Sequence, residues 1–142
     1  IYVRHTGDYS SLDFAGAWTK LWGCVKSQKL FTAGIQHVCI YHDDPKVTEP
    51  DKLRTDICLV IHKPAEAEGE IGVKILQGGK FAVFHYQGQY ANLGSVYDTI
   101  FGHWLPQSGL QLRDAACYEK YLNHPDPEAP EKSKTEIYVP VQ

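Results

Sequence analysis

The chain of 142 residues contains no methionine, no CxxC pair and no apolar run long enough to cross a bilayer. The missing methionine indicates either that processing removed the start of the chain or, the preferred interpretation, that this is a fragment of a longer chain. The four cysteines (Cys24, Cys39, Cys58 and Cys117) are scattered, which is typical of a protein of the reducing cytoplasm. The sequence therefore predicts a cytoplasmic protein with no membrane span and no disulfide scaffold.

A cluster of positive charge is also missing. Lys and Arg number 14 against 17 Asp and Glu, which gives a net charge of −3. Domains that bind nucleic acid by themselves usually carry a basic stripe, and none is present here. The composition therefore predicts that any DNA contact needs a further domain. Aromatic residues, by contrast, are abundant, with nine Tyr, three Trp and five Phe.

The chain does contain an internal repeat. Three pairs of segments match at a spacing of 80 or 81 positions: 7–12 with 88–93, 50–52 with 130–132, and 55–57 with 135–137. A period this long indicates one duplicated module rather than a solenoid. We expect a single effector-binding domain over 1–142, with module one at 1–64, a linker at 65–69 and module two at 70–142. A pocket is expected where the two modules meet.

Each module is predicted to fold as strand, helix, strand, loop and strand. The predicted strands are 1–5, 35–41, 56–61, 71–76, 81–86, 116–122 and 135–141. The fold class is therefore α+β, with two pseudo-twofold-related modules, a curved antiparallel sheet and two main helices. Gly78-Gly79 predicts a hairpin between 71–76 and 81–86.

Both helices are predicted from apolar spacing and end signals. The first has apolar residues at intervals of three and four (Phe14, Trp18, Leu21, Trp22 and Val25), with Ser10 or Ser11 as the cap. The second is expected to start at a cap on Asn92 and to end at Pro106.

Glu119 is the main candidate for a functional residue. On the strand 116–122 alternate side chains share a face, so Cys117, Glu119 and Tyr121 point the same way. A carboxylate buried among aromatic rings favours lipophilic cations, because cation–π contacts add about 0.5–2 kcal/mol each. The alternative is an exposed Glu119 that pairs with Arg113 or Lys120, since Glu is seldom fully buried.

The repeat places a matching face in module one. An offset of 80 brings His37, Cys39 and Tyr41 into the positions of Cys117, Glu119 and Tyr121. His37 and Tyr41 are therefore further candidates for ligand binding. No second pair of ligands follows at a spacing typical of a metal site, so no metal and no cofactor are predicted.

The chain resembles the effector-binding domain of AraC-type transcription regulators, also called the gyrase-inhibitory-protein-like small-molecule-binding domain. The matching stretches are 3–9, 18–22, 44–45, 81–88 with Tyr90, 104–109, 118–122 with Pro125, and 135–140. The most specific of them are Trp104-Leu105-Pro106-Gln107-Ser108-Gly109 and Glu119-Lys120-Tyr121-Leu122. The resemblance implies that Glu119 faces the cation of the ligand. It also implies that Tyr121 and Trp104 line the pocket.

Two classes of function follow. In the first, the chain binds a lipophilic, cationic small molecule and regulates transcription through a helix-turn-helix DNA-binding domain outside this chain. A stand-alone protein with the same binding chemistry would sequester toxins or drugs, or modulate gyrase. A homodimer is a candidate assembly. In the second, which the resemblance also implies, the chain is a hydrolase of strained cyclopropane-bearing electrophiles. Glu119 would then act as general base and Tyr121 would position the substrate. The first class is preferred, so the chain is predicted not to be an enzyme.

Overall fold

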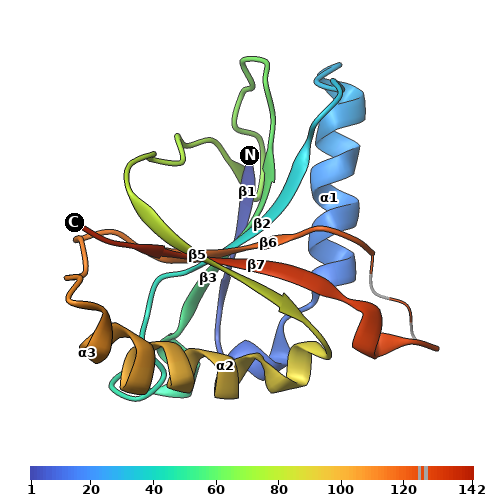
Figure 1. The fold of residues 1–142 in the computed structure, drawn as a ribbon. Coiled ribbons are helices and arrows are strands. Elements are labelled where there is room, and N and C mark those ends of the chain that lie inside the picture. Colours follow the sequence, from blue (N-terminus) through green and yellow to red (C-terminus); the bar gives the residue numbers. More distant parts are fainter. Residues whose placement is uncertain (125, 127) are drawn as a thin grey trace. The chain divides into compact units, whose positions relative to one another are not determined.

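The computed structural model describes residues 1–124, 126 and 128–142. Pro125 and Pro127 of the predicted loop lie outside the described residues, and so does the match at Pro125. The chain divides into two compact units, Ile1–Gln77 and Gly78–Gln142. Each unit contains antiparallel strands and one main helical segment (Figure 1), which confirms the α+β class.

The first unit contains four strands and one long helix. These are β1 (Tyr2–Thr6), α1 (Phe14–Ser27), β2 (Gln36–Tyr41), β3 (Arg54–Val60) and the short β4 (Ile71–Gly72). The strand order is β4-β1-β3-β2, with every neighbour antiparallel. The helix buries Ala17, Leu21, Cys24 and Val25, which follow the three-and-four spacing of an amphipathic helix.

The cap predicted for α1 is wrong. Asp13 caps the helix, since its carboxylate accepts a hydrogen bond from the Gly16 N–H at 3.0 Å. Ser10 and Ser11 instead belong to a separate 3₁₀ turn that is capped by Asp8. Ser10 and Ser11 lie too far before Phe14 to cap the helix, because a cap residue must directly precede the first helical residue.

The second unit contains three strands and a helical segment of three parts. These are β5 (Phe81–Gln87), α2 (Leu93–Thr99), a π-helical turn (Ile100–Trp104), α3 (Leu105–Ser108), β6 (Cys117–Tyr121) and β7 (Lys134–Pro140). The strand order is β6-β7-β5, again antiparallel. Its core is formed by Leu93, Ile100, Ile137, Val139 and Val141.

The strand registers of the two units confirm the repeat. His5 lies opposite Thr55 in the first unit, and Tyr86 lies opposite Thr135 in the second. Backbone contacts repeat as well: the Gly7 N–H donates to the Leu53 carbonyl at 2.8 Å, as the Gly88 N–H does to the Ser133 carbonyl at 2.9 Å. The order β1-β3-β2 therefore recurs as β5-β7-β6.

The strand predicted at 71–76 and its hairpin are wrong. Only Ile71–Gly72 forms a strand, and it pairs with β1 rather than with β5. β5 pairs with β7 instead. The apolar run had the composition of a strand, but composition does not choose the pairing partner. The residues 65–69 that were expected to be a linker lie inside the first compact unit.

The predicted ends of the second helix are also wrong. The Asn92 side chain makes no capping hydrogen bond, because a 3₁₀ turn over Tyr90–Asn92 leads directly into α2. Pro106 does not stop the helix, since it lies in the first turn of α3, where its missing N–H is tolerated. The helical segment ends at Gly109, whose φ of 73° few other residues adopt readily.

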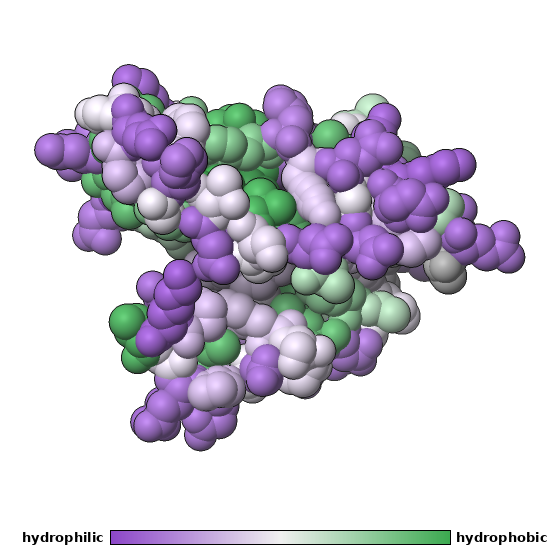
Figure 2. Space-filling model, turned by 60° about the horizontal axis from the view of Figure 1, so that its bottom comes forward, coloured by the Kyte–Doolittle hydropathy of each residue, from purple (hydrophilic) through white to green (hydrophobic). Residues whose placement is uncertain are grey.

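The surface carries scattered apolar side chains. Figure 2 shows one face, where polar and charged side chains surround separate apolar patches. Phe31, Val47 and Ile75 are among the large apolar residues that stay exposed. Isolated exposures of this kind are ordinary and do not mark a docking surface. No helix in the described part of the chain is long and apolar enough to cross a membrane.

Candidate functional site

Glu119 is buried in the second unit. Its relative exposure is 2%, which is unusual for a glutamate. The residue lies in β6, opposite the core residue Ile137 of β7. The prediction that Glu119 is buried is therefore confirmed, and the alternative of an exposed Glu119 is wrong.

Two tyrosines hold the Glu119 carboxylate. The Tyr121 hydroxyl donates to Oε1 at 2.8 Å, and the Tyr97 hydroxyl donates to Oε2 at 2.7 Å. Tyr121 reaches Glu119 because residues two apart on a strand share a face. Tyr97 comes from α2. Hydrogen bonds to a carboxylate are stronger than those between neutral groups, so both oxygens are held in place.

The tyrosines belong to a larger aromatic group. The Tyr121 ring lies 5.5 Å from that of Tyr90, and the Tyr97 ring stacks on that of Phe101 at 6.3 Å. Tyr, Phe and Trp rings can attract a cation through their faces. An acid with aromatic rings close by therefore has the chemistry to bind an organic cation.

Cys117 is a half-buried thiol two residues before this carboxylate on the same strand. Burial, together with the negative charge of Glu119, raises the pKa of Cys117 to about 11. The thiolate is the nucleophilic form of cysteine, and little of it is present at neutral pH. Cys117 therefore has the properties of a small core residue rather than of a catalytic nucleophile.

The predicted alternative partners of Glu119 are engaged elsewhere. Lys120 points to the other face of β6 and donates to the Tyr138 hydroxyl at 3.1 Å. Arg113 donates to three backbone carbonyls, those of Gly78, Lys80 and Val141. In the described residues neither side chain forms an ion pair with Glu119.

Trp104 lies at the end of the π-helical turn. Its ring packs edge-to-face on Phe84, with ring centroids 4.8 Å apart, next to the core of the second unit. The described residues show no hydrogen bond or ring contact between Trp104 and Glu119. A role of Trp104 in binding a ligand stays a prediction.

The first unit carries the corresponding face on β2. Cys39 lies opposite Ile57, just as Glu119 lies opposite Ile137, so the predicted equivalence of Cys39 and Glu119 is confirmed. Tyr41 packs against Tyr9, with ring centroids 5.0 Å apart. The repeat therefore presents a thiol where the other module presents a carboxylate.

His37 lies among aromatic rings in the same unit. The Trp22 indole N–H donates to His37 Nε2 at 3.2 Å, and the Trp18 ring lies edge-on at 4.9 Å. An indole N–H can only donate, so His37 Nε2 is the acceptor in this contact. Ligand binding by His37 and Tyr41 stays a prediction.

Tyr97 is the residue that the sequence did not single out. It occurs at helical spacing with other aromatic residues, and this pattern is equally typical of a core position. Only the packing of α2 brings its hydroxyl to the carboxylate. Within the described residues, no group of three or more His, Cys, Asp or Glu side chains could hold a metal ion.

A duplicated strand–helix–strand–strand module with antiparallel strands is the architecture of a class of ligand-binding domains. The chain belongs to the GyrI-like family, described as the GyrI-like small molecule binding domain, whose family model matches residues 1–142. The resemblance found in the sequence is confirmed.

Two kinds of curated relative are similar in sequence. The probable transcriptional regulator YgiV of Escherichia coli strain K12 is 33% identical over 101 residues, which cover 70% of this chain and 62% of that protein. A DNA gyrase inhibitor of Yersinia enterocolitica is 29% identical over 94 residues, or 63% of this chain and 60% of that protein. The match thus spans about three-fifths of the length of these relatives.

Solved structures share the fold. The crystal structure of the EcmrR C-terminal domain has a TM-score of 0.74 at 19% identity, over 99% of this chain and 89% of that chain. The EcmrR chain in a cryo-EM structure of an EcmrR–DNA complex has the same TM-score and identity, with 52% of that chain covered. At this identity the likeness shows the fold alone.

Proposed function

We propose that this chain is the effector-binding domain of an AraC-type transcription regulator and that its ligand is a lipophilic organic cation bound at Glu119. One observation carries the proposal. Glu119 is 2% exposed, and both of its carboxylate oxygens accept hydrogen bonds from tyrosine hydroxyls. A carboxylate retained among aromatic rings requires a reason, because burial of a charge is costly.

The arrangement suits a cation better than a neutral ligand. Coulomb attraction strengthens as the effective dielectric constant falls, so a buried carboxylate attracts a cation more strongly than an exposed one does. The phenols of Tyr97 and Tyr121 stabilise the negative charge before a ligand arrives. Aromatic faces would add about 0.5–2 kcal/mol per good contact with the cation.

The link to transcription is supported by the relatives. YgiV is named a probable transcriptional regulator, and EcmrR is described in complex with DNA. In this proposal DNA is contacted by a helix-turn-helix domain outside this chain, in a cytoplasmic protein that forms a homodimer. The ligand would change the DNA-bound state only by the difference between its affinities for two conformations. A stand-alone protein that sequesters drugs or modulates gyrase would use the same binding chemistry.

A hydrolase is the second candidate. The contact of Tyr97 and Tyr121 with Glu119 favours it, because a carboxylate and a phenol at hydrogen-bonding distance can act together on a substrate. Glu119 would remove a proton from water while a phenol polarised a strained cyclopropane-bearing electrophile. Binding alone needs fewer assumptions and is preferred.

The test is the binding of a cationic dye, with rhodamine 6G as the probe, to the wild type and to Glu119→Gln. The substitution keeps the shape and removes the charge, so we expect affinity to fall at least tenfold. Glu131→Gln, an exposed acid in the same unit, is the matched control and should bind as the wild type does. Equal affinity of Glu119→Gln and the wild type would contradict the proposal.

The same variants separate binding from catalysis. The wild type is incubated with a cyclopropane-bearing electrophile and the products are measured by mass spectrometry. Turnover that disappears in Glu119→Gln while the electrophile still binds would favour the hydrolase. Dye binding with no turnover would favour the sensor.

A further inference from the structure

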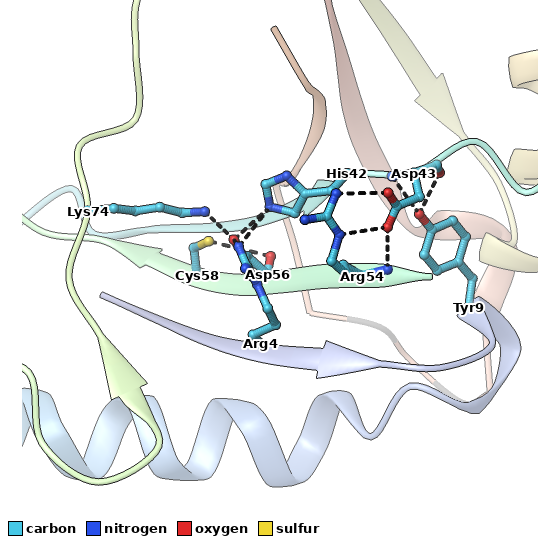
Figure 3. A network of polar contacts seen from close by, with 8 residues as sticks. All are labelled: Arg4, Tyr9, His42, Asp43, Arg54, Asp56, Cys58 and Lys74. Atoms are coloured by element: carbon cyan, nitrogen blue, oxygen red, sulfur yellow. Dashed lines mark hydrogen bonds and ion pairs between the residues drawn. The ribbon is translucent and has the colours of Figure 1, made fainter. Parts of the chain in front are cut away.

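A second charged cluster lies in the first unit, centred on Asp56 of β3. Its carboxylate is 0% exposed and accepts two hydrogen bonds from Arg4 of β1, from Nε at 2.8 Å and from Nη2 at 3.0 Å. His42 Nε2 lies 2.7 Å away, and the Lys74 ammonium also donates. Figure 3 shows that these side chains gather on the side of β1 and β3 away from α1.

The cluster carries more positive than negative charge. Burial alone would raise the pKa of Asp56, but hydrogen bonds from Arg4, Lys74 and His42 outweigh burial and hold that pKa well below its usual range. Asp56 is therefore ionised and can only accept, so His42 Nε2 carries the proton between them. With a neutral imidazole, Arg4 and Lys74 leave a net charge of +1, and with an imidazolium the net charge is +2.

The excess charge is presented to solvent. The carboxylate is inaccessible, whereas the side chains of Arg4, Lys74 and His42 are 42%, 30% and 21% exposed. Arginine has five N–H donors and lysine three, so each keeps donors that Asp56 does not use. In the described part of the chain no second acidic side chain pairs with these three groups.

A hollow of about 530 Å³ opens beside Arg4, with Tyr2, Gly69, Glu70 and Gly72 in its wall. The Tyr2 ring joins the hollow to the basic cluster, since Lys74 Nζ lies 4.5 Å and Arg4 Cζ 5.9 Å from its centroid. A Cβ at Gly72 would come within 2.6 Å of the Tyr2 ring and displace it, so the glycine lets the ring lie close to β4. Glu70, the acid in the wall, is paired with Lys20 at 2.6 Å.

We propose that Arg4, Lys74 and His42 bind the oxyanion of a small organic molecule whose body lies in the hollow along Tyr2. A guanidinium and an ammonium side by side match the oxygens of a phosphate or carboxylate group. Asp56 fixes the three basic groups before the anion arrives. The repeat does not duplicate this site, because the register aligns Glu136 with Asp56 but His85 with Arg4.

The test is a titration of the wild type with phenyl phosphate and with inorganic phosphate, at an ionic strength held constant with sodium chloride. We expect saturable binding of phenyl phosphate, with NMR shifts at the Tyr2 and His42 rings and none at His103 of the second unit. Inorganic phosphate should bind at least threefold more weakly, because it cannot use the Tyr2 hollow. The absence of saturable binding, or shifts spread over both units, would overturn the proposal.

Two variants locate the oxyanion. Lys74→Gln leaves Asp56 with Arg4 and His42, and it should weaken phenyl phosphate binding at least fivefold. Lys63→Gln removes a charge of the same unit whose ammonium donates to the Lys29 carbonyl and contacts neither Asp56 nor the hollow, and it should change binding less than twofold. Equal affinities of Lys74→Gln and the wild type, or an equal loss in Lys63→Gln, would overturn the proposal. A thermal unfolding curve of each variant confirms that it is folded.

Discussion

Tyr97 of α2 donates a hydrogen bond of 2.7 Å to Glu119 of β6, and so ties the helical layer of the second unit to the buried acid. Tyr121 holds the other oxygen from the same strand as Glu119. The π-helical turn begins three residues after Tyr97. Such turns occur often at functional sites, which agrees with a role for this end of α2.

Tyr97→Phe tests the hydrogen bond from the helix. The substitution leaves one carboxylate oxygen without its donor, so we expect the free energy of unfolding to fall by about 1–3 kcal/mol. Urea unfolding followed by circular dichroism measures it. Tyr86→Phe is the matched control, because within the described residues the Tyr86 hydroxyl donates only to the carbonyl of the exposed Gln89. A loss in Tyr97→Phe no larger than in the control would contradict the prediction.

Asp56→Asn tests the basic cluster of the first unit. Removal of the buried negative charge leaves Arg4 and Lys74 facing each other, and we expect a loss of about 2–4 kcal/mol of unfolding free energy. Glu136→Gln, the repeat equivalent, interrupts a contact to the exposed His85 and should cost less than about 1 kcal/mol. Chemical denaturation of both variants gives the comparison. Similar losses in the two variants would show that burial of the charge is not the cause.

The Asp56 carboxylate should also make the free energy of unfolding depend on pH. The pKa of Asp56 is lowered in the folded state, so below about pH 4 the unfolded chain binds more protons than the folded chain does. The contribution of Asp56 to the free energy of unfolding is therefore fully present above this pH and is lost as the pH is lowered further. Thermal unfolding of the wild type between pH 6 and pH 3 should show a steeper decline than that of Asp56→Asn. Parallel curves would contradict the assignment.

Cys117 reports on the charge of Glu119. Its pKa of about 11 predicts slow alkylation by iodoacetamide at pH 8, and Glu119→Gln should speed it by lowering that pKa. Cys58 serves as an internal control in the same digest. Burial raises its pKa to about 12 and Glu119 is not among the causes, so its rate should stay unchanged. An unchanged rate at Cys117 would indicate that Glu119 carries no charge beside it.

The sequence was most informative about the repeat and about Glu119. Turn residues at the same offset located both modules, and the alternation of side chains on a strand placed Glu119 with Cys117 and Tyr121. Both arguments use neighbours along the chain. The prediction failed at 71–76, where an apolar run matched a strand but formed only two paired residues.

Interactions between distant segments could not be read in this way. Arg4, His42 and Lys74 meet at Asp56 from three separate parts of the first unit, and no spacing in the sequence predicts their convergence. Tyr97 is a similar case, because its hydroxyl reaches Glu119 only through the packing of α2.

By itself, the order of residues determined a doubled α+β module and placed Glu119 on one face of its sixth strand with Cys117 and Tyr121, since strand alternation and turn chemistry are local properties of the chain. Only the tertiary structure decided which donors surround Glu119 and which cations surround Asp56. Those contacts depend on how strands and helices pack, and packing brings together side chains that the sequence keeps far apart.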